Sequence, residues 1–102
     1  MKRATVSTHV LDVSVGKPVA GVSVTLDGNK PQMTDANGRI AELVTGGVDS
    51  GAHQLVFDVG PYFGERAHLL NTVTLEVWIE EGQHYHVPLL ISPFGFTTYR
   101  GT

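Results

Sequence analysis

The feature of this sequence that most constrains its fold is an alternation of apolar and polar residues with a period of two. It is clearest over residues 72–80, where Val, Leu, Val and Ile occupy every second position with Thr, Glu or Trp between them. Because successive side chains of a β-strand point to opposite faces, such a segment is a strand with one buried face. The pattern recurs over residues 22–27. Further strands are predicted over residues 4–13, 38–44, 52–59, 84–91 and 95–100.

Turn-forming residues separate the predicted strands. Glycine, proline, asparagine and aspartate, which supply positive φ angles or preset a turn, cluster at residues 16–18, 27–31, 35–38 and 81–82. Residues 60–71 lack the alternation, and Pro61 near their start predicts a short helix there. Short strands at this spacing are typical of an all-β sandwich or barrel. The length of 102 residues, without a repeat or linker, fits one domain spanning 1–102.

Composition excludes several kinds of function. The formal net charge is -3 and the seven lysines and arginines form no basic run, which argues against a nucleic-acid partner. The absence of cysteine excludes disulfides, a thiolate nucleophile and a cysteine-ligated zinc site. No apolar stretch resembles a signal peptide or is long enough to span a bilayer, so we expect a cytoplasmic protein without a membrane partner. A domain this small is also expected to associate with copies of itself.

Histidine is the side chain in this sequence best suited to proton transfer near neutral pH. The five histidines are His9, His53, His68, His84 and His86. His84 and His86 are two residues apart in a predicted strand, so both project from the same face. Such a pair can form half of a metal site or a proton-transfer site. The metal alternative is the weaker one because no pattern supplies a third ligand. His53 and His68 lie in or near loops, where a structural role is the expectation.

The sequence contains no ready nucleophile. There is no cysteine, no Gly-x-Ser-x-Gly motif and no glycine-rich phosphate-binding loop. An enzyme with this sequence would therefore use water as the nucleophile and histidine as the base, acting on an electrophile that is already activated. Arg39 directly follows the turn at residues 34–38. It is either a solvated rim residue or a guanidinium that clamps a planar, oxygen-rich ligand through two hydrogen bonds.

The C-terminal residues Tyr99, Arg100, Gly101 and Thr102 follow a predicted strand without a polar tail. Chain termini are usually loose unless they are held by specific contacts. This ending therefore predicts a C-terminus that is docked at a particular place.

Three separated segments resemble the signatures of one family, the 5-hydroxyisourate hydrolases of the transthyretin-like group. Residues 8–12 (THVLD), followed by GKP at 16–18, resemble the opening signature. Residues 34–39 (TDANGR) are similar to the central Asp-x-x-Gly-Arg turn. Residues 84–93 (HYHVPLLISP), continuing to YRGT at 99–102, resemble the C-terminal signature nearly intact. The segments occur in the family's order, and the C-terminal one is long and specific.

The resemblance implies a transthyretin-like sandwich of two four-stranded sheets with one short helix. It implies a homotetramer, a dimer of dimers with active sites in the groove between dimers. The implied reaction is hydrolysis of 5-hydroxyisourate to 2-oxo-4-hydroxy-4-carboxy-5-ureidoimidazoline in urate degradation, without metal or cofactor. Carried over by position, the catalytic residues are His9, Arg39 and His86, which favours His86 over His84. The implied substrate-binding residues are Tyr99, Arg100, Gly101 and Thr102.

The sequence departs from the family pattern at two places. Thr102 stands where the family usually ends in serine, which keeps the hydroxyl and adds a methyl group. Residues 69–71 (LLN) stand where the family often has an aromatic pair and a proline. The second departure affects local packing rather than the chemistry.

Two other classes of function are alternatives. Transthyretin itself has the implied fold and carries hydrophobic hormones in the equivalent groove without catalysis. It lacks, however, the histidine pattern and the Tyr-Arg-Gly-Ser type of ending. A sandwich domain used only for protein contacts would explain the strands but not the three polar segments. That alternative predicts that residues 9, 39 and 86 lie far apart in the folded protein.

Overall fold

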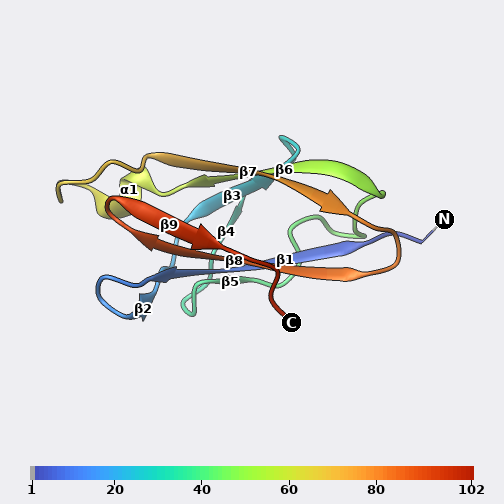
Figure 1. Cartoon of the computed structure of the whole chain (residues 1–102), viewed down its shortest axis with the longest axis horizontal. Coiled ribbons are helices and arrows are strands. Elements are labelled where there is room, and N and C mark those ends of the chain that lie inside the picture. The colour runs from blue at the N-terminus through green and yellow to red at the C-terminus, as the bar shows by residue number, and fades with distance from the viewer. Residues whose placement is uncertain (1) are drawn as a thin grey trace.

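The computed structural model describes residues 2–102, and Met1 lies outside the described part. Within that part the chain forms strands and one helical turn (Figure 1). In chain order these elements are β1 (Thr5–Asp12), β2 (Lys17–Pro18), β3 (Ser23–Leu26), β4 (Gln32–Met33), β5 (Arg39–Ile40), β6 (Gly51–Asp58), α1 (Gly60–Phe63), β7 (Thr72–Ile79), β8 (His84–Ser92) and β9 (Gly95–Thr98).

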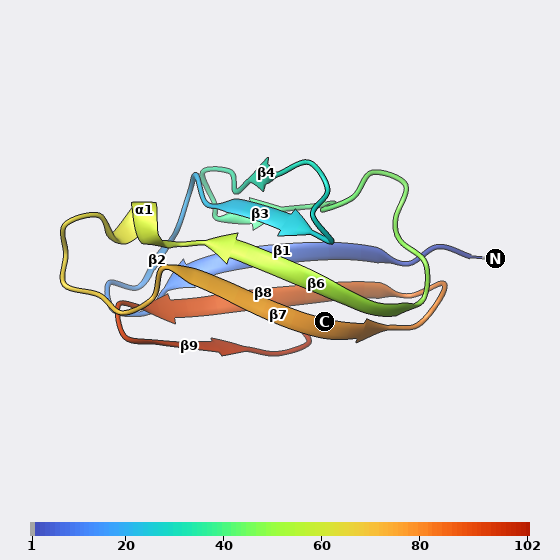
Figure 2. The same cartoon turned by 90° about the horizontal axis from the view of Figure 1, so that it is seen from above.

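The strands form two sheets packed as a sandwich, which confirms the predicted all-β, transthyretin-like architecture (Figures 1 and 2). One sheet has the order β4-β3-β6-β7 and the other has the order β2-β1-β8-β9. In the second sheet β5 also pairs with β1, so that sheet contains five strands rather than the predicted four. It remains four strands wide, because β2 pairs with residues 11–12 of β1 and β5 pairs with residues 8–9 along the same edge.

The core lies between the two sheets and is formed by the side chains on one face of each long strand. In β8 the side chains of Tyr85, Val87 and Leu89 are buried, whereas His84 is exposed and His86 is half-buried. This is the division of faces that the sequence predicts. β1 and β8 are parallel neighbours at the centre of their sheet, with Val6 opposite Tyr85. The outer face of this central pair therefore carries Thr5, Ser7 and His9 of β1 and His84 and His86 of β8.

The strand predicted over residues 38–44 is much shorter than the sequence pattern indicates, whereas the predicted short helix is present. The strand predicted over residues 38–44 pairs with β1 only at Arg39–Ile40, after which a single hydrogen bond from Leu43 N to Val6 O (2.9 Å) continues the contact. The predicted helix is the one turn Gly60–Phe63, with Pro61 at its start and Gly64 (φ 57°) ending it. No helix within residues 2–102 is long and apolar enough to cross a membrane.

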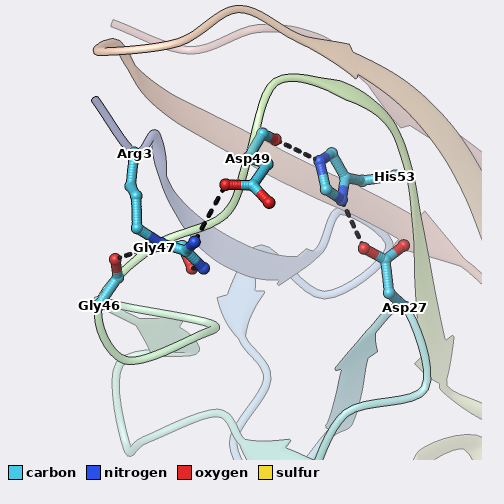
Figure 3. Close-up of polar contacts among 6 residues, drawn as sticks. All are labelled: Arg3, Asp27, Gly46, Gly47, Asp49 and His53. Carbon is cyan, nitrogen blue, oxygen red and sulfur yellow. Dashed lines mark hydrogen bonds and ion pairs between the residues drawn. The ribbon is translucent and has the colours of Figure 1, made fainter. Parts of the chain in front are cut away.

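His53, in β6, connects three segments at one end of the β4-β3-β6-β7 sheet (Figure 3). Its Nδ1 bonds the Asp27 carboxylate after β3, and its Nε2 donates to the carbonyl oxygen of Asp49 at 2.6 Å. The Asp49 carboxylate in turn accepts a bond from Arg3 (3.0 Å). Both imidazole nitrogens of His53 thus face oxygen acceptors, which favours the doubly protonated ring. Burial alone lowers the pKa of His53, but the hydrogen bonds to Asp27 and Asp49 outweigh it and raise that pKa above 6.5. The structural role expected for His53 agrees with these contacts.

We expect the free energy of unfolding to depend on pH through this cluster. The raised pKa of His53 means that its contribution is complete below pH 6.5 and is lost as pH rises through the folded-state pKa. The pKa of Asp27 is lowered, because hydrogen bonds from Gln54 and His53 outweigh burial, so its contribution is lost only in acid below 3.8. Urea unfolding of wild type and His53→Gln protein between pH 5 and 9 measures the effect. At pH 6 the variant should lose about 1.5–3 kcal/mol, and this gap should narrow toward pH 9. A gap that does not change with pH would contradict a charged His53.

Candidate active site

A tight turn places Arg39 at the start of β5. The carboxylate of Asp35 accepts hydrogen bonds from the backbone of Asn37 (2.9 Å) and of Arg39 (3.0 Å). Gly38 has φ 77°, and a Cβ atom there would collide with the carbonyl oxygen of Val10. The Asp-x-x-Gly-Arg pattern thus encodes this turn through contacts of its own residues. Aspartate closes the turn, glycine permits the close approach to β1, and arginine emerges beside β1.

Strand register places the three predicted catalytic residues on one face. His9 in β1 lies opposite Arg39 in β5 on one side and opposite Pro88 in β8 on the other. His86 lies two residues before Pro88 and opposite Ser7, so it is a diagonal neighbour of His9. Diagonal neighbours in a sheet are about 7–8 Å apart between Cα atoms, within reach of long side chains. The face they share is the outer one, away from the core.

Two adjoining hollows on this face have Arg39 in common. One, of about 320 Å³, is lined by His9, Leu11, Pro18, Asn37 and Arg39. The other, of about 330 Å³, includes Arg39 together with Ser7, Asp35, His84 and His86. Arg39 therefore lines both the hollow that contains His9 and the hollow that contains His86. The alternative of a purely structural domain predicts these three residues far apart, and their clustering argues against it.

The environment of His86 favours its neutral form. Burial lowers the pKa of the His86 imidazole, and the positive charge of Arg39 and the neighbouring His9 and His84 lower it further. A histidine with a pKa below its ordinary 6.5 is neutral at pH 7 and can accept a proton. Asp35, in the same hollow, has a lowered pKa because it accepts the backbone hydrogen bonds of Arg39 and Asn37.

Hydrogen bonds join His86 to polar residues that the sequence did not single out. Ser7 Oγ lies 2.8 Å from His86 Nδ1 and 3.0 Å from His84 Nε2. Thr5 Oγ1 lies 2.6 Å from His84 Nδ1. The four side chains alternate across β1 and β8, with Thr5 opposite His84 and Ser7 opposite His86. The period-two pattern places Ser7 on the face of His9, but only knowledge of the parallel pairing would have placed it beside His86.

The C-terminus is docked against the site, as its sequence predicts. The backbone N–H of Gly101 donates to the carbonyl oxygen of His86 at 2.7 Å, and the two residues form an isolated β-bridge. A Cβ atom on Gly101 would lie 2.7 Å from Cδ2 of the His86 ring and 3.3 Å from Pro88. Gly101 therefore packs directly against the imidazole of His86. Because glycine has no side chain, the ring can occupy the space that a Cβ atom would take.

The other C-terminal residues lie elsewhere in a single chain. Tyr99 and Arg100 line a groove of about 440 Å³ between β7 and β9, not the hollows around Arg39. The Arg100 guanidinium lies 4.2 Å from the centre of the Tyr85 ring and donates to Gln83 (3.0 Å). Thr102 is exposed. One chain thus brings together His9, Arg39, His86 and Gly101 but leaves Tyr99 and Arg100 at the sheet edge.

No group of three or more His, Asp or Glu within residues 2–102 is arranged to hold a metal ion. Each hydrogen-bonded imidazole nitrogen of the His84–His86 pair faces a serine or threonine hydroxyl.

The fold and this cluster define a class: a transthyretin-type β-sandwich with two histidines and an arginine on the outer face of one sheet. The chain belongs to the HIUase/Transthyretin family, whose family model matches residues 6–101.

Individual relatives agree with this membership. The chain is 41% identical to a 5-hydroxyisourate hydrolase of Mesorhizobium japonicum, over 94% of this chain and 90% of that protein. It is similar in structure to the 5-hydroxyisourate hydrolase of Klebsiella pneumoniae, with TM-score 0.86 and 33% identity, covering 100% of this chain and 97% of that one. It is also similar to transthyretin from Sparus aurata, with TM-score 0.84, 25% identity and 97% coverage of both chains.

Proposed function

We propose that this protein is a hydrolase that converts 5-hydroxyisourate to 2-oxo-4-hydroxy-4-carboxy-5-ureidoimidazoline in urate degradation. The observation that carries the proposal is the convergence of His9, Arg39 and His86 on one sheet face. They converge in a chain 41% identical to a 5-hydroxyisourate hydrolase. The same three residues are those that the sequence signatures mark as catalytic.

The geometry supports attack by water on the ring amide carbonyl. His86, neutral because its pKa is lowered by burial and by Arg39, takes the proton from the attacking water and returns it to the ring nitrogen when the C–N bond breaks. Arg39 donates hydrogen bonds to the carbonyl oxygen and stabilises the negative charge that develops there. His9 faces Arg39 from the neighbouring strand, where it orients the water or shares the role of base. No step requires a metal or cofactor.

The rival proposal is a transthyretin-like protein that binds a small molecule without catalysis. The similarity to Sparus aurata transthyretin supports the fold of that alternative equally well. The polar cluster favours the hydrolase, because a carrier of hydrophobic ligands has no need for two imidazoles and a guanidinium on one polar face.

The direct test follows the ultraviolet absorbance of 5-hydroxyisourate generated in place by urate oxidase. Accelerated decay with this protein, over the spontaneous rate, supports the hydrolase. No acceleration by folded protein, combined with binding of a small apolar ligand, would favour the carrier.

We also propose that the protein assembles as a homotetramer, a dimer of dimers. β7 and β9 are the outer strands of the two sheets, lie along the same side of the molecule (Figure 2) and flank the groove lined by Tyr99 and Arg100. Trp78 on β7 is 68% exposed. An eight-residue outer strand with one exposed and two half-buried apolar side chains is a template for pairing with a second chain. Sedimentation equilibrium should give four times the 11.0 kDa chain mass.

Further proposals concern the domain and its location. We propose that residues 1–102 act as one domain, in the cytoplasm, without a nucleic-acid or membrane partner. The formal net charge of -3 supports the absence of a nucleic-acid partner. Cell fractionation tests the location.

Gly101→Ala protein is expected to fold normally and to lose activity. The added methyl group would press on Cδ2 of His86, and that ring or the C-terminal residues must move. A displacement of about 1 Å in a catalytic group can cost on the order of 10²-fold in rate. Steady-state kinetics should therefore show a fall in kcat of about 10- to 10²-fold. Gly95→Ala, where a Cβ would meet only Ser92 at 3.8 Å, is the matched control. Equal activity of the two variants would contradict a close fit of Gly101 against His86.

A further inference from the structure

A chain of four hydrogen-bonded side chains leads from His86 to the protein surface. It runs from His86 Nδ1 to Ser7 Oγ, from Ser7 Oγ to His84 Nε2, and from His84 Nδ1 to Thr5 Oγ1, at 2.8, 3.0 and 2.6 Å. Ser7 is only 8% exposed, whereas His84 is exposed. Within the described residues the other nitrogen of the His86 ring, Nε2, makes no hydrogen bond to the protein.

The hydrogen count at Ser7 makes this chain directional. The hydroxyl has one proton but faces two imidazole nitrogens, so it donates to one and accepts from the other. When His86 Nδ1–H donates to Ser7, the Ser7 hydroxyl donates to His84 Nε2 and His84 Nδ1–H donates to Thr5. In that arrangement Nε2 of His86 carries a free lone pair, as a general base requires. The reverse arrangement places a proton on Nε2 and leaves no lone pair there.

We propose that Ser7 and His84 are a positioning and proton-relay pair for His86, an inference that rests on the proposed hydrolase function. In the proposed direction Ser7 Oγ accepts from Nδ1–H of His86, and this hydrogen bond stabilises the tautomer with the proton on Nδ1. When Nε2 takes a proton from water, the Nδ1 proton passes to Ser7 Oγ and the Ser7 proton passes to His84 Nε2. His86 is then neutral again, with its proton on Nε2, and the positive charge lies on the His84 ring. When the C–N bond of the substrate breaks, Nε2 of His86 gives its proton to the leaving nitrogen and the relay runs in reverse, from His84 through Ser7 to Nδ1 of His86. This restores the resting tautomer and a neutral His84.

The charges around His86 provide the reason for moving the proton away. The face of β1 and β5 next to His86 presents Arg39, His9 and, in the turn before β5, the carboxylate of Asp35. A cationic ring at His86 is disfavoured by burial and by the positive charge of Arg39. His84 is exposed, so water solvates its cation. Transfer through Ser7 therefore places the charge where solvent stabilises it, as proton shuttles built on histidine do.

Nitrogen NMR of the resting protein tests the positioning without any substrate. With 15N-labelled histidine at pH 8, His86 should show a protonated Nδ1 and an unprotonated Nε2. In Ser7→Ala protein this tautomer should lose its dominance, because the acceptor at 2.8 Å is gone. A wild-type His86 protonated mainly on Nε2 overturns the proposal whether or not the protein is a hydrolase.

Kinetics of paired variants test the relay. Ser7→Ala and His84→Gln should each lower kcat about 10-fold with KM unchanged, because they break the same chain, and the double variant should be no slower than either single one. Ser7→Thr keeps the hydroxyl and should retain activity, which separates loss of the relay from a failure to fold. Normal kcat in His84→Gln, with Ser7→Ala slow, would leave Ser7 acting alone and overturn the relay. If wild-type protein shows the Nδ1–H tautomer but no hydrolysis, the proposed function fails and the tautomer assignment stands.

Discussion

Arg39→Ala protein is expected to retain its fold and to lose on the order of 10²–10³-fold in kcat, the cost of removing one donor to a developing oxyanion. Arg39 is exposed, and its position depends on backbone hydrogen bonds to Asp35 rather than on its own side chain. The truncation therefore removes the guanidinium and leaves the turn intact. Decay of 5-hydroxyisourate absorbance, corrected for the spontaneous reaction, measures the loss.

Two further variants sharpen this expectation. Arg39→Lys keeps the positive charge but not the planar pair of donors, so its activity should fall between those of wild type and Arg39→Ala. His53→Gln removes a histidine from the Asp27–Asp49 cluster, at the opposite layer of the sandwich, and should leave turnover unchanged despite its lower stability. Equal losses in Arg39→Ala and His53→Gln would remove the case for Arg39 as the oxyanion donor.

The sandwich could be predicted because period-two patterns report burial directly. The alternation in residues 72–80 predicts a half-buried strand, and β7 is that strand. Which segments pair with each other was harder to predict from the sequence. The segment at 38–44 has strand-like composition, but only Arg39–Ile40 pair with β1, and the bond from Leu43 N to Val6 O is the one later backbone hydrogen bond of this segment to that strand. β-pairing is a property of the neighbouring segment as much as of the strand itself.

In the candidate site, too, contacts between residues close in sequence could be predicted, whereas contacts between distant residues could not. The turn that presents Arg39 is formed by the consecutive residues 34–39, so Asp35 and Gly38 were enough to predict it from the sequence. The contact of Ser7 with His86 joins positions 79 residues apart through a parallel pairing. No local pattern encodes that register. Spacing therefore left His84 and His86 equivalent, and only the family resemblance favoured His86.

Tyr99 and Arg100 extend this reasoning to the assembly. Sequence resemblance groups them with the catalytic residues, yet in one chain they line the groove at the edges of β7 and β9. The hollows around Arg39 are open to solvent on the outer face of their sheet, so a single chain would not shield a bound substrate from water. A second chain packed on that face would deepen them. The proposed tetramer would therefore complete the binding site, which is open to solvent in the single chain.

His86→Ala protein is expected to lose about 10²–10⁴-fold in kcat, the range for removal of a positioned general base. His68→Ala is the matched control, because His68 is a histidine that bonds the backbone of Arg66 and stacks on Phe63 away from the cluster. Comparable losses in the two variants would show that turnover follows histidine content or stability rather than a base at position 86.

The pH profile links His86 to Arg39. A base must be neutral to act, so kcat/KM should fall in acid as His86 becomes protonated. Because burial and the charge of Arg39 lower the pKa of His86, that fall should occur below pH 6.5. In Arg39→Ala protein one cause of the lowering is absent, so the midpoint of the residual activity should move toward higher pH. An unchanged midpoint in Arg39→Ala would assign the acid limb to another group, and His9, which faces Arg39 directly, would then be the base to test.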